Sequence, residues 1–298
     1  MEIDSGPGPY DSGPSKYSKE LTVTGLVSET VRLWTRKLPQ YVVIVGITGL
    51  LFSILQIAIL LSLYGVGGLY LIDYIGTTPI DTIFNFLLLP FTNEILMTFL
   101  VLSILSLIIY SIIGGAAIDY AFDDYENPGS ANIGDSFSYA LGRAVHLIGV
   151  QFIQSIIIIP LGLVALLLLF ANPFISIALI FLLLYVAVRL GVAVAIVITE
   201  EKSAIPALNR SWQITGGLFV HVFAGQLLMG IIAIIINLIL AVIIGMVVVV
   251  IVFDLDIAVA IGTIIASIFV GSLSYIFQAV LYKDLESRGI SHDVDMWQ

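Results

Sequence analysis

The sequence predicts an all-α polytopic membrane protein, with six transmembrane helices in three hairpins and an amphipathic helix before each hairpin. Composition is the first observation behind this class: 59% of the 298 residues are hydrophobic and only 11% are charged, whereas soluble domains carry about 25% charged residues. The second is that uncharged runs of about 20 or more residues recur, each long enough to cross a bilayer as a helix. These runs are continuously apolar, which favours helices over a transmembrane barrel.

Composition and charge also limit the domain organisation, the kinds of site and the partners that we expect. The chain has no cysteine, which excludes disulfides, thiolate metal sites and cysteine nucleophiles. A net charge of −10 argues against a nucleic-acid partner. Residues 1–20 are rich in Gly, Pro and Ser, so we expect a disordered cytoplasmic tail and no signal peptide. The six-span membrane domain is predicted over 21–285, and a polar cytoplasmic tail over 286–298.

The first hairpin begins with an amphipathic stretch. In Leu21–Leu38, apolar residues recur at three- and four-residue spacing, with polar residues on the other side. The first span is predicted at Tyr41–Leu63 and the second at Ile95–Ile118. Between them, Tyr64–Glu94 holds no Lys or Arg, and we favour a loop packed on the bundle over a re-entrant turn. Asp119–Ala131 is expected to be an acidic, solvated, turn-rich loop.

The other two hairpins follow the same design. The second amphipathic stretch is Asn132–Arg143 and the third is Thr199–Gly217, in which Ser203 can cap a helix. We call the three predicted amphipathic helices elbow helices and expect them to lie at the membrane surface. The three units share this arrangement of helices, but their amino-acid sequences do not repeat. The remaining four spans are predicted at Ala144–Phe170, Phe174–Ile198, Leu218–Phe253 and Ile257–Tyr282.

The basic residues indicate the orientation of the chain. Nearly all of the 11 Lys and Arg residues lie near the two termini or in the elbow helices, and the loops Tyr64–Glu94, Ala171–Pro173 and Asp254–Asp256 contain none. Six spans place both termini on one side of the membrane. The positive-inside rule makes that side, and the elbow helices with it, cytoplasmic in a cytoplasmic membrane.

Arg189 is the one basic residue that falls within a predicted span, about ten residues, or roughly 15 Å, from its cytoplasmic end. An intramembrane charge is costly, which suggests a site for an anion or a lipid headgroup. The structural alternative, which we favour, is that Arg189 extends toward the interface or pairs inside the bundle. Arg143 and Arg210, in the second and third elbow helices, complete the candidate headgroup site.

Four other residues fit the role of interfacial anchors, because Trp and basic side chains gather at membrane surfaces. They are Trp34, Arg36, Lys37 and Trp212.

The sequence predicts no catalytic residues, no metal site and no cofactor. His146 and His221 lie near elbow helices and His292 in the tail, without the three or four convergent ligands that a metal needs. The acidic residues of 119–135 do not follow the calcium-loop pattern. Gln154 lies within a span, where polar side chains commonly bond neighbouring helices.

Two segments resemble a known family. Val197–Gly217 (VITEEKSAIPALNRSWQITGG) is similar to the elbow of the membrane domain found beside some glycerophosphodiester phosphodiesterases, with Ile214 where that pattern has Leu. Ala279–Arg288 (AVLYKDLESR) is similar to the closing segment of that domain. The catalytic domain of such proteins is a barrel of about 250 residues, for which this chain has no soluble segment. The resemblance therefore implies a membrane domain that is not an enzyme.

We expect a non-catalytic integral membrane protein that organises lipid or a membrane partner through its cytoplasmic face, as a scaffold or subunit. Membrane lipids are the expected partners, together with a protein partner or further copies of the chain. The alternative is a small-solute or ion transporter or channel with a polar site at mid-membrane. A continuous polar cavity lined by Arg189 and Gln154 would favour that alternative.

Overall fold

The structure is a computed structural model that describes residues 20–64 and 93–295. Within these residues it contains helices and short connections and no strand, which confirms the predicted fold class. The predicted tail over 1–20 and the connection over 64–94 lie almost wholly outside the described residues. The helices are α1 (Val23–Arg36), α2 (Leu38–Tyr41), the π-helix η1 (Val42–Ile47), α3 (Thr48–Tyr64), α6 (Asn93–Glu126), α7 (Ile133–Gly142), α8 (Ala144–Ala171), α9 (Pro173–Leu190), α10 (Ala193–Thr199), α11 (Ala204–Gly216), α12 (Phe219–Val252), α13 (Leu255–Val270) and α14 (Leu273–Asp295).

Six helical stretches of the described residues are long and apolar enough to cross a membrane, as predicted. We number the spans in chain order: α2–η1–α3, α6, α8, α9–α10, α12 and α13–α14. Helix α12 is 34 residues long and fills the uncharged run that the sequence showed. It ends at Phe253, whose φ of 55° turns the chain directly into α13.

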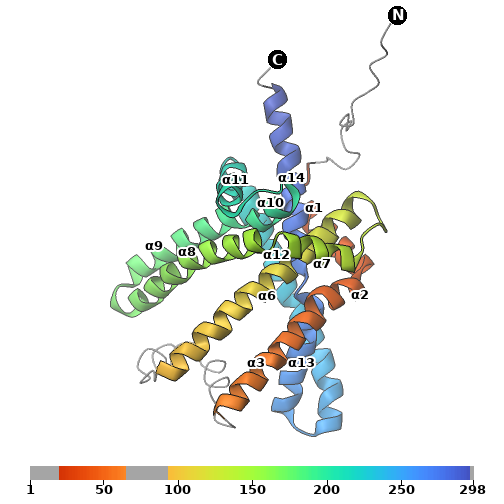
Figure 1. The fold of residues 1–298 in the computed structure, drawn as a ribbon, viewed down its shortest axis with the longest axis vertical. Coiled ribbons are helices and arrows are strands. Elements are labelled where there is room, and N and C mark those ends of the chain that lie inside the picture. The colour runs from red at the N-terminus through yellow and green to blue at the C-terminus, as the bar shows by residue number, and fades with distance from the viewer. Residues whose placement is uncertain (1–19, 65–92, 296–298) are drawn as a thin grey trace, which may run out of the picture.

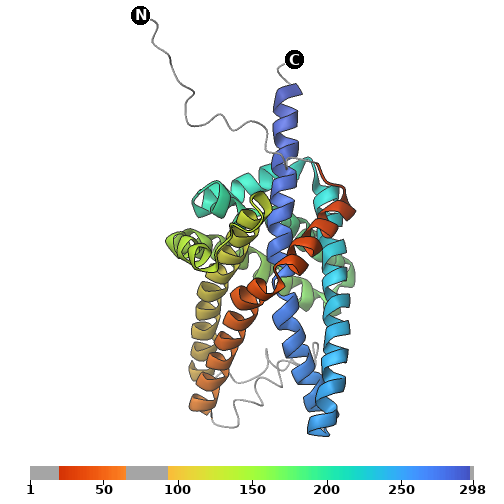
Figure 2. The same cartoon turned by 90° about the vertical axis from the view of Figure 1, so that its right-hand side faces the viewer.

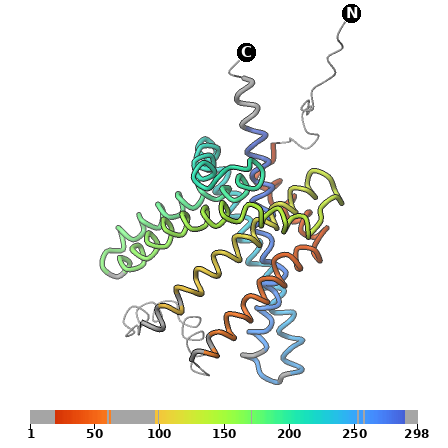
Figure 3. Tube along the Cα trace, viewed as in Figure 1, coloured from red at the N-terminus to blue at the C-terminus, as the bar shows by residue number. Residues whose placement is uncertain are grey.

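The spans gather at one end and diverge toward the other (Figures 1 and 2). We call the end that carries α1, α7 and α11 the elbow side, and the opposite end, where α8 turns into α9 and α12 into α13, the turn side. The trace in Figure 3 shows the α8–α9 hairpin leaning away from the α12–α13 hairpin. Much of the buried core lies toward the elbow side, and Val192–Ile198, around α10, is buried throughout.

The elbow helices are α1, α7 and α11, and each packs on the second span of a hairpin. Helix α7 packs on α6, α11 on α9 and α10, and α1 on α14. The first elbow helix therefore covers the last span and closes the three hairpins into a ring. The buried faces of these helices meet protein, where the sequence suggested a membrane surface; in α1 that face includes Leu26, Leu33 and Trp34.

Two spans are interrupted where continuous helices were predicted. Span four breaks at Gly191–Val192 and span six at Gly271–Ser272. A break frees carbonyl groups that need donors away from water. The donors come largely from the elbow helices: at the first break Ser211 of α11 bonds a carbonyl, and at the second Trp34 of α1 does so.

Two boundaries differ from the prediction. The loop expected over Asp119–Ala131 is helical as far as Glu126, and the polar tail expected over 286–298 continues α14 to Asp295. Near these helix ends, Asp124 of α6 and Asp284 of α14 are held by hydrogen-bonded partners. Asp124, expected in a solvated loop, has a fully buried side chain.

Candidate functional site

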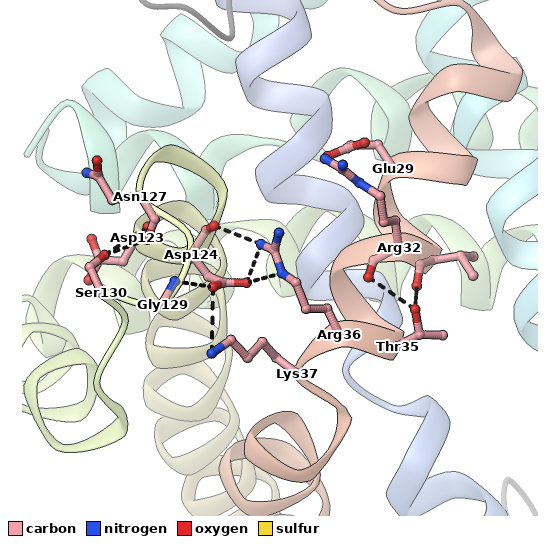
Figure 4. Close-up of polar contacts among 11 residues, drawn as sticks. Glu29, Arg32, Thr35, Arg36, Lys37, Asp123, Asp124, Asn127, Gly129 and Ser130 are labelled. Atoms are coloured by element: carbon pink, nitrogen blue, oxygen red, sulfur yellow. Dashed lines mark hydrogen bonds and ion pairs between the residues drawn. The ribbon is translucent and has the colours of Figure 1, made fainter.

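Nearly all of the basic residues that the sequence offered for binding are engaged in ion pairs. The first cluster surrounds Asp124 of α6 (Figure 4). Arg36 donates to its Oδ2 from Nη2 at 2.6 Å and from Nε at 3.2 Å, and Lys37 Nζ lies 4.0 Å from Oδ1. The backbone N–H of Gly129 also donates to Oδ1, at 3.1 Å. These anchors therefore fasten the end of α1 to α6.

The second cluster is built on Glu200 and Glu201, at the corner between α10 and α11. Arg143 forms an ion pair with the Glu201 carboxylate and donates from Nη1 to the Glu201 carbonyl at 3.1 Å. Tyr139 Oη donates to Glu201 Oε1 at 3.0 Å. These contacts hold Glu201 at a φ of 53°, which is unusual for a residue other than glycine. Arg210 donates to Glu200 from Nε at 3.3 Å.

Both glutamates carry a lowered pKa. Hydrogen bonds from Arg143 and then Tyr139, together with the charge of Arg143, lower the pKa of Glu201. Burial by itself raises the pKa of Glu200, but its hydrogen-bonded and charged partners outweigh burial and hold that pKa below its usual value. Both groups therefore act as carboxylates that join neighbouring helices.

The third cluster surrounds Asp284 of α14, whose side chain is fully buried. Its carboxylate accepts hydrogen bonds from the Leu21 N–H at 2.6 Å and from Arg288 Nε at 3.0 Å, and His221 Nε2 lies 2.9 Å away. Arg288 Nη2 donates in turn to the Leu21 carbonyl at 2.6 Å. Both main-chain polar groups of Leu21 are thus held, which secures the start of α1 to α12 and α14.

Arg189 is different: among the nine Lys and Arg residues of 20–64 and 93–295, it alone has no carboxylate partner. It lies next to the break in span four, on the elbow side. Its carbonyl accepts a hydrogen bond from Ser211 Oγ at 2.8 Å, and the Leu190 carbonyl accepts one from Gln154 Nε2, also at 2.8 Å. Helices α8 and α11 thereby fix the backbone that carries the guanidinium group.

The Arg189 guanidinium group rests on aromatic rings. Its Cζ lies 4.5 Å from the ring centroid of Trp212 and 5.6 Å from that of Tyr185. Gly216 makes room for it, because a Cβ at that position would lie 2.6 Å from Arg189 Nη1. Trp212, predicted as an interfacial anchor, is therefore a platform for Arg189. Trp34, also predicted as an anchor, is only 8% exposed and donates from Nε1 to the Phe269 carbonyl at 3.0 Å.

The electrostatic balance at Arg189 is incomplete. Its Nε and Nη1 are buried and have no acceptor among the described residues. Each unmet donor costs about 1–3 kcal/mol. The C-terminal end of α11, beside Gly216, offers about 0.3–1 kcal/mol, and the cation–π contact about 0.5–2 kcal/mol. These gains roughly balance one donor and leave the other unbalanced, so the arrangement favours an anion.

The rings under Arg189 belong to a row of four aromatic side chains on three helices, which we call the aromatic row: Trp212, Tyr185, Phe219 and Phe223. Consecutive ring centroids lie 5.7, 5.1 and 6.0 Å apart. The row begins in α11, passes through α9 and enters the first turns of α12. The sequence gives no sign of this row, because its members lie up to 38 residues apart in three separate helices.

Cavities that the described residues line elsewhere in the bundle include one on the elbow side and one near the turn side. An open cavity of about 610 Å³ is lined by α7 residues and Arg143. An apolar cavity of about 320 Å³ lies between α12 and α13 near the turn side, around Gly245 and Leu255. Neither is lined by Arg189 or Gln154. Within the described residues, no group of three His, Asp or Glu side chains could hold a metal ion.

No protein-family model, curated protein or solved structure matches this chain. The resemblance to the membrane domain found beside glycerophosphodiester phosphodiesterases therefore stays a prediction. The two segments that carry it do meet in the structure, since Tyr282 Oη donates to Glu200 Oε1 at 3.0 Å.

Proposed function

We propose that this chain is a non-catalytic integral membrane protein that binds an anionic lipid, or an anionic membrane partner, on its elbow side. The observation that carries the proposal is the cation of Arg189, which has no carboxylate partner among the described residues and two buried nitrogens without an acceptor. Arginine presents its donors in a planar fork that suits phosphate and carboxylate groups. An anion at this position would supply the acceptors that the protein lacks.

The ion pairs reduce the three arginines predicted as headgroup ligands to one. Arg143 and Arg210, predicted as headgroup ligands, are paired with Glu201 and Glu200, and those pairs hold helices together. Binding an anion there would require breaking an existing pair. Arg189 needs no such exchange, which makes it the residue that we assign to binding.

The surroundings of Arg189 favour binding over transport. A transporter with a polar site at mid-membrane is the alternative that the sequence raised. Arg189 instead lies against an elbow helix, at the break between α9 and α10, and the Gln154 amide is engaged with the Leu190 carbonyl. Both observations support a binding site beside the elbow helix.

We also propose that the elbow side faces the cytoplasm in a cytoplasmic membrane. The support is the positive-inside rule, since all nine basic residues of the described ranges lie at or near the elbow side of their spans. An anionic inner leaflet would then meet Arg189 directly.

The test is a titration of the purified protein, in a neutral detergent, with dioleoyl-phosphatidylglycerol, and bound lipid is measured by native mass spectrometry. We expect saturable binding that exceeds binding of dioleoyl-phosphatidylcholine about tenfold, and a loss of this preference in Arg189→Gln. Removing one charged interaction of about 1.4 kcal/mol corresponds to that factor. Arg210→Gln is the matched control, because it deletes a paired cation nearby. Equal binding of both lipids by the wild type would refute the proposal.

A further inference from the structure

We infer that the ligand of the Arg189 site is one phospholipid, with its phosphate on the Arg189 guanidinium group and a hydrocarbon chain along the aromatic row. This inference rests on the proposed function and adds the chemical class of the ligand. Its basis is a juxtaposition that anion binding alone does not require. A cation with unmet donors stands at one end of a row of four aromatic rings.

The row runs in the direction that a lipid would take. Trp212 belongs to an elbow helix, and Tyr185 lies one turn before Arg189 in α9, on the side away from the elbow. Phe219 is the first residue of α12, and Phe223 lies about 6 Å further along the span, at helical rise. A molecule that touches both ends of the row is therefore polar at the elbow side and apolar below it.

The exposure of these side chains fits an outside ligand. Trp212 and Tyr185 are 36% and 38% exposed, although each packs against the next ring of the row. Arg189 as a whole is partly exposed while its Nε and Nη1 are buried, so an anion would reach these nitrogens after a shift of the side chains that cover them. The rings gain by covering their exposed faces with hydrocarbon, at about 25 cal/mol per Å² of apolar surface.

Other anions fit this arrangement less well. A free phosphate ion would lose hydration on entering a site lined by aromatic rings and would gain nothing from Phe219 or Phe223. A carboxylate on a protein partner would satisfy the guanidinium group but would leave the exposed faces of Trp212 and Tyr185 uncovered. A phospholipid joins the anion and the hydrocarbon in one molecule and already resides at this depth of the bilayer.

The experiment compares ligands that share a phosphate and differ in their hydrocarbon: inorganic phosphate, dihexanoyl-phosphatidylglycerol and dioleoyl-phosphatidylglycerol. Binding to the full chain in a neutral detergent is measured by native mass spectrometry. We expect the dioleoyl lipid to bind at least about tenfold more tightly than the dihexanoyl lipid, with no binding of inorganic phosphate. Arg189→Gln should weaken the binding of both lipids about tenfold, and Arg189→Lys should restore part of it.

The aromatic row is tested by Phe223→Ala, which shortens its inner end without touching Arg189. We expect this variant to lose most of the preference for the longer chain. Phe174→Ala is the control, because Phe174 is 84% exposed at the turn side, about 22 Å from Arg189 along α9. If Phe223→Ala does not yield folded protein by size-exclusion chromatography, Tyr185→Leu tests the middle of the row.

Three outcomes would overturn the inference, and the first two separate it from the proposed function. If all three ligands bind equally and depend on Arg189, the site takes a free anion, so the inference fails and the proposed function stands. If no ligand binds in an Arg189-dependent manner, both fail. Retention of the chain-length preference in both Phe223→Ala and Tyr185→Leu would also overturn the inference.

Discussion

Asp284→Ala should be among the most destabilising substitutions on the elbow side. The change removes a fully buried carboxylate that accepts from the Leu21 N–H and Arg288 Nε and also contacts His221. Three hydrogen bonds to a charged group, at about 1.5–3 kcal/mol each, give an upper bound of roughly 4–9 kcal/mol. The His221 and Arg288 side chains are 16% and 20% exposed, so water can satisfy part of what they lose.

The expected loss is therefore about 3–5 kcal/mol, the range measured when one partner of a buried ion pair is removed. At about 2 °C per kcal/mol for a chain of this size, the thermal midpoint in a neutral detergent should fall by about 6–10 °C. Asp135→Ala is the control: this aspartate is exposed in the first turn of α7, and its loss should cost less than about 1 kcal/mol. If Asp284→Ala melts within about 1 °C of the wild type, the clamp on Leu21 contributes nothing and our reasoning is wrong.

Gly216→Ala should displace the Arg189 guanidinium group, since the new Cβ would lie 2.6 Å from Nη1. In the lipid titration it should weaken the binding of dioleoyl-phosphatidylglycerol about tenfold. Unchanged binding would contradict the placement of the phosphate on Arg189. Trp34→Phe removes the donor to the Phe269 carbonyl and should lower the free energy of unfolding by about 1–2 kcal/mol, measured by thermal denaturation. Because the pKa of Glu201 is lowered in the folded protein, its charge stabilises the fold above the ordinary pKa, and this stabilisation is lost as pH falls through the lowered value. Glu201→Gln should therefore melt below the wild type at pH 7, and the two midpoints should converge on acidification below about pH 4.5. A gap that persists in acid would contradict the assignment.

The spans and the elbow helices could be predicted from the sequence because a bilayer leaves a simple signature. A helix that crosses hydrocarbon must be long and uncharged, and a helix with two environments shows them as two faces. These signals are local, so a single sequence suffices to read them. They do not say what the second environment is, and the face of α1 that was expected at the membrane surface packs on α14.

The ion-pair clusters could not be predicted, because their partners are far apart in sequence. Asp284 and His221 are separated by 63 residues, and Arg36 and Asp124 by 88. The same limit applies to the hydrogen bond from Trp34 to the Phe269 carbonyl, whose partners are 235 residues apart. This hydrogen bond depends on a carbonyl group that the break in span six leaves without a helical donor. The sequence around Gly271 does not distinguish that break from a continuous helix.

The candidate site could be predicted from the sequence only in part. Arg189 stood out because it alone among the basic residues falls within a predicted span, which is a local signal. The aromatic platform came from Trp212 and Tyr185, which no spacing rule connects. The absence of a carboxylate partner among the described residues could be recognised only once the other basic residues had been placed.

The most direct test of the central claim is an experimental density map of the protein in nanodiscs that contain phosphatidylglycerol. Our account predicts density for a phosphate within hydrogen-bonding distance of the Arg189 guanidinium group, about 2.7–2.9 Å for a charged pair, with a hydrocarbon chain along Trp212, Tyr185 and Phe219. Ordered lipid found elsewhere on the bundle, with no density beside Arg189, would contradict it.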